Sequence, residues 1–120
     1  MQENAPSTSA DDLVGIKNLE EEFDVDLAKE LAQAYLDDTE TIVEKMQTAL
    51  DANDQEGLRS AAHMLKGCSR AIQAWKCEQT SSMLEHDARD GNLESARNSL
   101  PDVIEAYSQT KAFLKQYLNS

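Results

Sequence analysis

Residues 57–77, GLRSAAHMLKGCSRAIQAWKC, carry the pattern that decides the fold class. Apolar or small side chains recur in this stretch every three or four residues, at Leu58, Ala61, Leu65, Cys68 and Ile72. Since an α-helix has about 3.6 residues per turn, this spacing places the five side chains on one face of a helix. We therefore expect a helix that packs this face, Cys68 included, into a core and turns its opposite face to solvent.

The same helical spacing continues on both sides of this stretch. Ser9 with Asp12 is typical of a helix start, and Asp26 is the expected N-cap of a long second helix. The step at residues 37–39 predicts a kink, and Pro101 predicts a kink or break in the last helix. The expected helices span about 10–23, 27–50, 55–72, 74–89 and 93–120.

The spacing of these segments favours an all-α domain over a turn-rich β architecture. The 120 residues include only two Pro and four Gly, so long stretches are free of turn signals. We expect an antiparallel four-helix bundle with a short extra N-terminal helix. Residues 10–120 would form this domain, after a disordered tail of residues 1–9.

The composition describes an acidic protein without membrane or secretion signals. It has 11 Lys and Arg against 23 Asp and Glu, a net charge of −12, so we expect no nucleic-acid partner. No apolar run reaches the roughly 20 residues of a membrane span, and the first residues lack the regions of a signal peptide. We expect a cytoplasmic monomer. Cys68 and Cys77 match no common zinc or redox spacing and are expected to be reduced structural thiols.

Residues 57–77 also stand out by their charge. They hold four cations and no carboxylate, whereas the rest of the chain holds the other seven cations and all 23 carboxylates. On the expected helix, His63 lies opposite the core face, and its neighbours there are cationic or small: Arg59, Lys66, Gly67 and Arg70. His63 is therefore predicted to point at solvent among positive charges.

An exposed imidazole in this setting is suited to act as a nucleophile. A lone pair on one ring nitrogen can attack an electrophile, and Lys66 and Arg70 would hold a dianionic adduct. A phosphoryl group fits that description. Gly67 costs about 1 kcal/mol in a helix interior relative to Ala. We interpret it as leaving room for the phosphoryl group or for a partner.

The segment His63-Met64-Leu65-Lys66-Gly67-Cys68-Ser69 resembles the His-x-x-Lys-Gly-x-Ser motif of histidine-containing phosphotransfer (HPt) domains, which act in multistep phosphorelays. The resemblance extends over about residues 13–118 and departs from the common pattern at Cys68, where Ser or Ala is more usual. It implies a four-helix bundle with an exposed histidine. That histidine takes a phosphoryl group from the aspartyl phosphate of one receiver domain and passes it to the aspartate of another, without ATP.

The resemblance also implies individual roles. His63 would be the phosphorylated residue, Lys66 a cation near the phosphoryl oxygens, and Gly67 the small neighbour that keeps access open. Glu85 matches the position from which family members hydrogen-bond the other ring nitrogen, which would fix the tautomer of the ring. Arg89 resembles a basic residue that lies near the site in some members.

The implied partners are the receiver domains of hybrid sensor kinases and of response regulators. Receiver active sites cluster acidic residues around Mg²⁺, which a positive face would attract, so the protein itself is expected to need no cofactor and no metal. Apolar residues flanking the histidine would supply docking area. The expected receiver-binding surface consists of Leu13, Ile16, Arg59, Met64, Ala71 and Arg89.

Other functions fit the sequence less well. A zinc site built from His63, His86, Cys68 and Cys77 is disfavoured because Cys68 is expected to face the core and His63 the solvent. A phosphopantetheine carrier would need an Asp-Ser-Leu attachment site, which residues 81–84 do not supply. The alternative that stays open is a helical adaptor, which would dock receivers or other partners without phosphotransfer.

Overall fold

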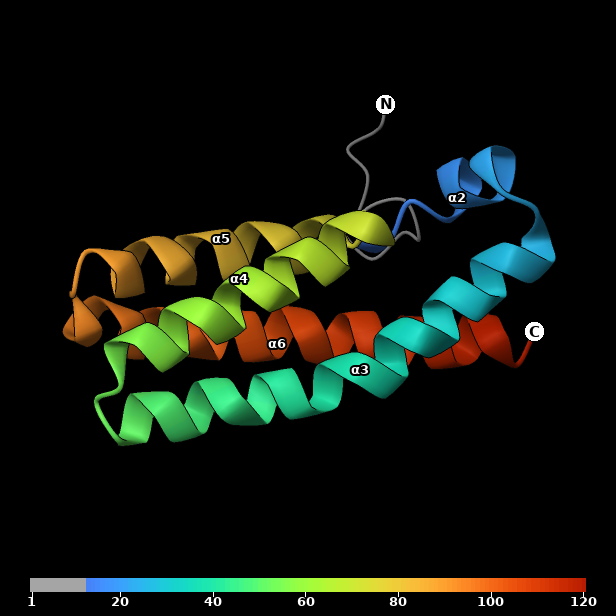
Figure 1. The fold of residues 1–120 in the computed structure, drawn as a ribbon. Helices are drawn as coiled ribbons and strands as arrows, with labels where there is room; N and C mark the ends of the chain where they lie inside the picture. The colour runs from blue at the N-terminus through green and yellow to red at the C-terminus, as the bar shows by residue number, and fades with distance from the viewer. Residues whose placement is uncertain (1–12) are drawn as a thin grey trace, which may run out of the picture.

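The computed structural model describes residues 13–120 and contains five α-helices in that range (Figure 1). The expected tail of residues 1–9 and the helix start near residue 10 lie outside the described residues. Between residues 13 and 120 there is no strand, so the predicted all-α class is confirmed. The helices are α2 (Ile16–Glu22), α3 (Val25–Asp51), α4 (Gln55–Ala71), α5 (Trp75–Arg89) and α6 (Leu93–Leu118).

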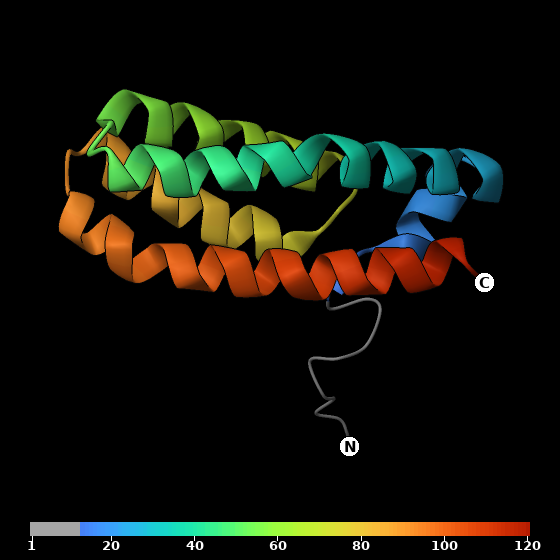
Figure 2. The same ribbon diagram turned by 90° about the horizontal axis from the view of Figure 1, so that it is seen from below.

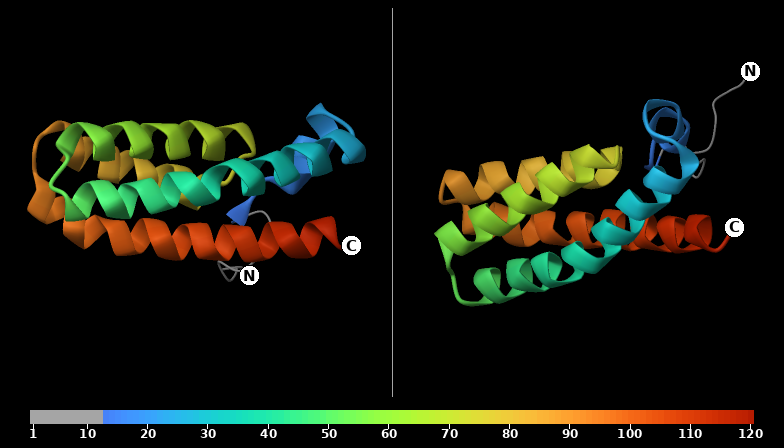
Figure 3. Two further views of the ribbon diagram at one scale, coloured as in Figure 1. Left: turned by 60° about the horizontal axis from the view of Figure 1, so that its bottom comes forward. Right: turned by 45° about the vertical axis from the view of Figure 1, so that its right-hand side comes forward.

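Four of these helices lie along one another, and the chain reverses direction at each connection. In Figure 1 the chain runs leftward along α3 and α5 and rightward along α4 and α6. Helix α4 packs against α3 and α5, and α6 packs against the same two helices. Figure 2 shows the four helices from below, and Figure 3 shows α2 at the end of the bundle where α3 projects beyond α4.

Side-chain caps fix where three of the helices begin. The carboxylate of Asp24 accepts a hydrogen bond from the Leu27 backbone N–H at 2.7 Å, and that of Asp54 accepts one from Gly57 at 2.9 Å. Asn92 caps α6 in the same way. The prediction of Asp26 as the N-cap of α3 was therefore wrong by two residues. Asp24 has the extended backbone that a cap needs, whereas Asp26 lies in the first turn, where a negative charge favours the helix dipole.

The two expected interruptions have different outcomes. Helix α3 is one continuous element, and Figure 1 shows it changing direction about half-way along. Near that point the Thr39 hydroxyl donates to the Tyr35 carbonyl at 2.6 Å, a contact that commonly bends helices. Of the kink or break expected at Pro101, the break is wrong, because α6 continues through this residue to Leu118. Pro101 is exposed, so water can reach the carbonyl of Arg97, which the proline leaves without its helical donor.

The core confirms most of the expected α4 face and corrects one turn of it. Leu58, Ala61 and Leu65 are buried, but Cys68 is only half-buried and the next residue, Ser69, is fully buried. The Ser69 hydroxyl is tolerated there because it shares a hydrogen bond with the Tyr35 hydroxyl at 2.9 Å. Tyr35 also donates to the Cys77 sulfur at 3.3 Å, so two buried hydrogen bonds of Tyr35 join α3 to α4 and α5.

Candidate functional site

Helix α4 presents His63 to solvent, as the sequence predicts. Its side chain is 64% exposed, on the flank of α4 that faces α5. On the opposite side of α4, Leu58, Leu65 and Ser69 fill the core and fix the rotation of the helix. The ring is therefore accessible on a rigid element rather than on a loop.

A single carboxylate on α5 contacts both His63 and Lys66. Glu85 Oε2 lies 2.8 Å from His63 Nδ1, and Glu85 Oε1 lies 2.7 Å from Lys66 Nζ. The side chains of Glu85 and Lys66 are only 13% and 21% exposed. Glu85 thus holds the exposed ring through Nδ1, and the ion pair between Glu85 and Lys66, which joins α5 to α4, is largely shielded from solvent.

The contact with Glu85 determines which ring nitrogen is free to react. Desolvation raises the pKa of Glu85, but the hydrogen bonds from Lys66 and His63 outweigh it and hold the pKa below its ordinary value. The carboxylate is therefore ionised at neutral pH and can only accept, so the proton of a neutral ring lies on Nδ1. Nε2 then keeps its lone pair.

No contact within the described structure requires a glycine at position 67. A Cβ built at this position would meet no atom within 4 Å beyond its own helical neighbours. The residue is exposed and lies one helical turn after His63. The space that an alanine side chain would occupy is therefore open to a visiting molecule.

The other predicted cations are not gathered around the ring. Arg70 is 66% exposed and its guanidinium pairs with Glu78 of α5 at 2.7 Å, while Arg59 pairs with Glu56. The hydrogen bonds that Arg59 donates to Glu56 raise the pKa of its guanidinium, and the charges of Glu56 and Glu85 add to the effect. Residues 57–77 contain no carboxylate, but three of their four cations pair with carboxylates that lie outside this stretch of sequence.

Arg89 and His86 form a separate pair at the end of α5. Arg89 Nη2 lies 2.8 Å from His86 Nδ1, and its Nε lies 3.9 Å from Asp90. No hydrogen bond or ion pair among residues 13–120 joins Arg89 to His63 or to Glu85.

The expected docking residues divide into two groups. Met64 and Ala71 are exposed on α4, and Met64 is 49% exposed. Ile16 is 9% exposed and belongs to the core, and Leu13 is half-buried against it. The sequence pattern placed Ile16 correctly on an apolar face, but that face packs inward, which removes Ile16 from the expected surface.

The cysteines lie in protected positions. Cys77 is buried, and desolvation raises the pKa of its thiol; the same cause raises that of Cys68. Among residues 13–120, no group of three or more His, Cys, Asp or Glu is arranged to hold a metal ion. In the same range, no helix is both long and apolar enough to span a membrane.

Two residues that the sequence reasoning passed over contribute to the site region. Ser69 hydrogen-bonds Tyr35 and so joins α4 to α3, and Glu78 forms an ion pair with Arg70. A signal for Glu78 was available, because it precedes Glu85 by seven residues and so lies on the same face of α5. Ser69 is the last residue of the motif, but its burial depends on Tyr35, 34 residues away, which the spacing within α4 does not show.

Comparison with known proteins agrees with this geometry. The family model of the Hpt domain matches residues 30–116. Multistep phosphorelay regulator 1 of Schizosaccharomyces pombe is 26% identical over an alignment of 112 positions, which covers 82% of this chain but only 38% of that protein. Pseudo histidine-containing phosphotransfer protein 2 of Oryza sativa subsp. japonica is 25% identical over 104 residues, covering 85% of this chain and 69% of that protein.

A solved structure extends the likeness to three dimensions. Histidine-containing phosphotransfer protein B (HptB) of Pseudomonas aeruginosa PAO1 matches with a TM-score of 0.80 and 26% identity, covering 87% of this chain and 90% of that one. The chain therefore belongs to the Hpt domain family, since the family model covers well over half of its length. Sequence, fold and relatives agree on a phosphorelay intermediate, as the motif around His63 implied.

Proposed function

We propose that this phosphorelay intermediate carries its phosphoryl group on Nε2 of His63. The observation that supports this most strongly is the pairing of an exposed ring with a carboxylate at Nδ1, 2.8 Å away. That pairing leaves Nε2 both unprotonated and accessible. A histidine that served only as an exposed polar residue would need neither the largely covered Glu85 nor the open space at Gly67.

The transfer step follows from this tautomer. The Nε2 lone pair attacks the phosphorus of a receiver's aspartyl phosphate, the P–O bond to the aspartate breaks, and the aspartate leaves as a carboxylate. The ring becomes positively charged while Nδ1 keeps its proton, and Glu85 stabilises that charge. In the reverse step, the carboxylate of a second receiver attacks the phosphorus, and Nε2 recovers its lone pair. No proton is exchanged with solvent in either direction.

Lys66 is the cation we assign to the phosphoryl oxygens. Its ion pair with Glu85 holds it beside the ring, whereas Arg70 would first have to leave Glu78. Two unit charges about 4 Å apart interact by roughly 1 kcal/mol in water and about 4 kcal/mol at an effective dielectric of 20. The contribution of Lys66 should therefore grow when a docked receiver excludes water.

We propose that the partners are receiver domains of hybrid sensor kinases and response regulators, and that the receiver supplies the Mg²⁺. The phosphocarrier itself acts as a cytoplasmic monomer without a cofactor, and its antiparallel four-helix bundle serves as the scaffold for the ring. The site itself offers a nucleophile, His63, and a cation, Lys66, held by one carboxylate.

The test is a transfer assay with a panel of purified, phosphorylated receiver domains. The wild-type protein should take up label that is lost in acid and survives base, as phosphohistidine does. His63→Gln should take up none. His86 is also an exposed histidine on a helix, so His86→Gln is the matched control and should take up label as wild type does. Equal labelling of wild type and His63→Gln would refute the assignment. Binding of receivers by wild type without any uptake of label would favour the adaptor function.

A further inference from the structure

The hydroxyl of Tyr35 is a buried polar group that the transfer step does not use. It lies 2.9 Å from the Ser69 hydroxyl of α4 and 3.3 Å from the Cys77 sulfur of α5. Since Tyr35 donates its one proton to the sulfur, the Ser69 hydroxyl donates to the Tyr35 oxygen. Burial raises the pKa of Tyr35 well above its ordinary value, so the hydroxyl keeps this proton at neutral pH.

These buried hydrogen bonds specify one arrangement of three helices. Apolar side chains of similar size could replace such a set of polar groups at little cost in stability. The polar groups match one another only when α3, α4 and α5 lie in one register. If α4 slid along α5 by one residue, about 1.5 Å, Tyr35 could keep good hydrogen-bond geometry with only one of its two partners. The hydroxyl therefore favours a single register of α4 against α5.

The phosphotransfer site lies in the same α4–α5 interface. Along α4, Ser69 follows His63 by six residues, about 9 Å. Along α5, where the chain runs the opposite way (Figure 1), Cys77 precedes Glu85 by eight residues, about 12 Å. Glu85 Oε2 lies 2.8 Å from His63 Nδ1, and lengthening this distance by about 1 Å breaks the hydrogen bond. The contact that fixes the tautomer of the ring therefore depends on the register of the two helices.

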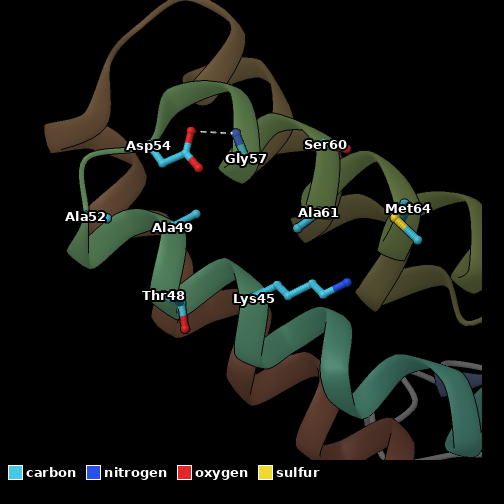
Figure 4. Close-up of a pocket in the computed structure, with 9 residues that line it drawn as sticks. All are labelled: Lys45, Thr48, Ala49, Ala52, Asp54, Gly57, Ser60, Ala61 and Met64. Carbon is cyan, nitrogen blue, oxygen red and sulfur yellow. Dashed lines mark hydrogen bonds between the residues drawn. The ribbon is translucent and has the colours of Figure 1, made fainter.

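Packing against α3 does little to fix the first half of α4 along its axis. Figure 4 shows a groove of about 410 Å³ between the two helices, alongside this half of α4. Small side chains of both helices line it, such as Ala49 and Ala61, and they offer little shape for one helix to lock onto the other. Among the side-chain hydrogen bonds and ion pairs of residues 13–120, the one between Tyr35 and Ser69 is the one that joins α3 to α4.

We propose that Tyr35 is a positioning residue for phosphotransfer. Through its partners on α4 and α5, it sets the register at which Glu85 meets His63. The inference rests on the proposed function, because it assigns a support to the same ring. Tyr35 is buried, so a receiver cannot touch it, and loss of its hydroxyl should slow the chemical step without changing how a receiver binds. Misplacing a reacting group by about 1 Å can cost up to a hundredfold in rate.

The first test removes the hydroxyl and keeps the ring. Tyr35→Phe is compared with Tyr107→Phe, because Tyr107 is also buried and its ring lies beside that of Tyr35. The Tyr107 hydroxyl lies 3.1 Å from that of Thr39, on α3, and among residues 13–120 it has no hydrogen bond to α4 or α5. Tyr35→Phe should slow transfer about fivefold at saturating phosphorylated receiver, with an unchanged half-saturating concentration. Tyr107→Phe should change both quantities less than about twofold.

The second test shows whether Tyr35 acts through Glu85. In a protein that already carries Glu85→Ala, Tyr35→Phe should change the transfer rate less than about twofold, because two groups that act through one contact have non-additive effects. NMR of His63 supplies a readout that needs no transfer. Its Nδ1 proton should exchange with water about threefold faster, or more, in Tyr35→Phe than in wild type and in Tyr107→Phe.

A second variant guards against a loss of folding. Ser69→Ala deletes the α4 partner of the same hydrogen bond and should change the transfer rate and the proton exchange in the same direction as Tyr35→Phe. Far-UV circular dichroism and urea unfolding of each variant check that the helices are intact. A variant that is as destabilised as Tyr107→Phe but transfers more slowly has lost positioning and not only stability.

The possible results separate this inference from the proposed function. If wild type takes up no acid-labile label, the proposed function fails, and the exchange of the Nδ1 proton still tests the positioning of the ring. If wild type is labelled and Tyr35→Phe matches Tyr107→Phe in rate and in proton exchange, His63 transfers but Tyr35 does not position it. Additive effects of Tyr35→Phe and Glu85→Ala would also overturn the inference, since Tyr35 would then act on something other than the contact of Glu85.

Discussion

At the scale of single residues, the reactivity assigned to His63 depends on Glu85. We predict that Glu85→Gln slows phosphotransfer about tenfold, because the amide oxygen still accepts from Nδ1–H but no longer carries the charge that stabilises the ring and holds Lys66. Hydrogen bonds to charged groups contribute about 1.5–3 kcal/mol, and the lower end of this range corresponds to about a tenfold change in rate. The measurement is the transfer rate at saturating phosphorylated receiver.

The matched control for this variant is Glu78→Gln. Glu78 lies on the same face of α5 and pairs with Arg70 at 2.7 Å, but it makes no contact with His63. This variant should change the transfer rate less than about twofold. Equal rates for Glu85→Gln and wild type would show that the carboxylate does not support the reaction.

At the scale of elements, Gly67 in α4 should reveal a conflict between stability and activity. Gly67→Ala should stabilise the protein by up to about 1 kcal/mol, since alanine favours the helix and its Cβ meets no other atom. The free energy of unfolding in urea measures this effect. Transfer from a receiver should become slower, and Gly67→Leu should slow it further. A destabilised Gly67→Ala protein, or unchanged transfer in both variants, would contradict this account of the glycine.

Pro101 in α6 provides a prediction for stability alone. Pro101→Ala restores a donor to the Arg97 carbonyl inside a helix that already continues to Leu118. We expect an increase in the free energy of unfolding of about 1–3 kcal/mol, with transfer activity unchanged, because Pro101 is exposed and lies on α6, which does not carry the site. Urea unfolding measures it, and a less stable variant would show that the local backbone is adapted to proline.

The helices show which parts of a fold are encoded locally. The start of α4 at Asp54 and the face formed by Leu58, Ala61 and Leu65 followed from the sequence, because capping and spacing are properties of neighbouring residues. The continuity of α6 through Pro101 did not follow, because proline disfavours a helix interior and the contacts of α6 with α3 and α5 are not visible in its own residues. At Pro101 the observed helix therefore departs from the local preference of proline to end a helix.

At the scale of the whole molecule, Glu85 should make the free energy of unfolding depend on pH in the acid range. The pKa of Glu85 in the folded protein lies below its ordinary value of 4.5, so the unfolded state binds a proton at higher pH than the folded state. The stabilisation from this group is complete above the unfolded value and is lost as pH falls through the folded value. Wild type should exceed Glu85→Gln in stability by on the order of 1 kcal/mol at about pH 7, and by less at about pH 3. Urea unfolding at both pH values measures it, and a difference independent of pH would contradict it.

The charge distribution shows what the sequence could not predict about the site. The exposed face with His63, Lys66 and Gly67 followed from periodicity in one helix. The neutralisation of Arg59 and Arg70 did not, because Glu56 lies outside the window and Glu78 comes from another helix. Three of the four cations of the window are therefore paired with carboxylates from outside it, which the periodicity of one helix could not show.

The central claim is that Nε2 of His63 receives the phosphoryl group while Nδ1 stays protonated toward Glu85. The most direct measurement is ¹⁵N and ³¹P NMR of protein labelled at histidine, recorded before and after phosphorylation by a receiver. We predict a phosphoramidate on Nε2 of His63, with the Nδ1 proton retained and slowed in its exchange with water. A phosphoryl group on Nδ1, or on any residue other than His63, would contradict the account.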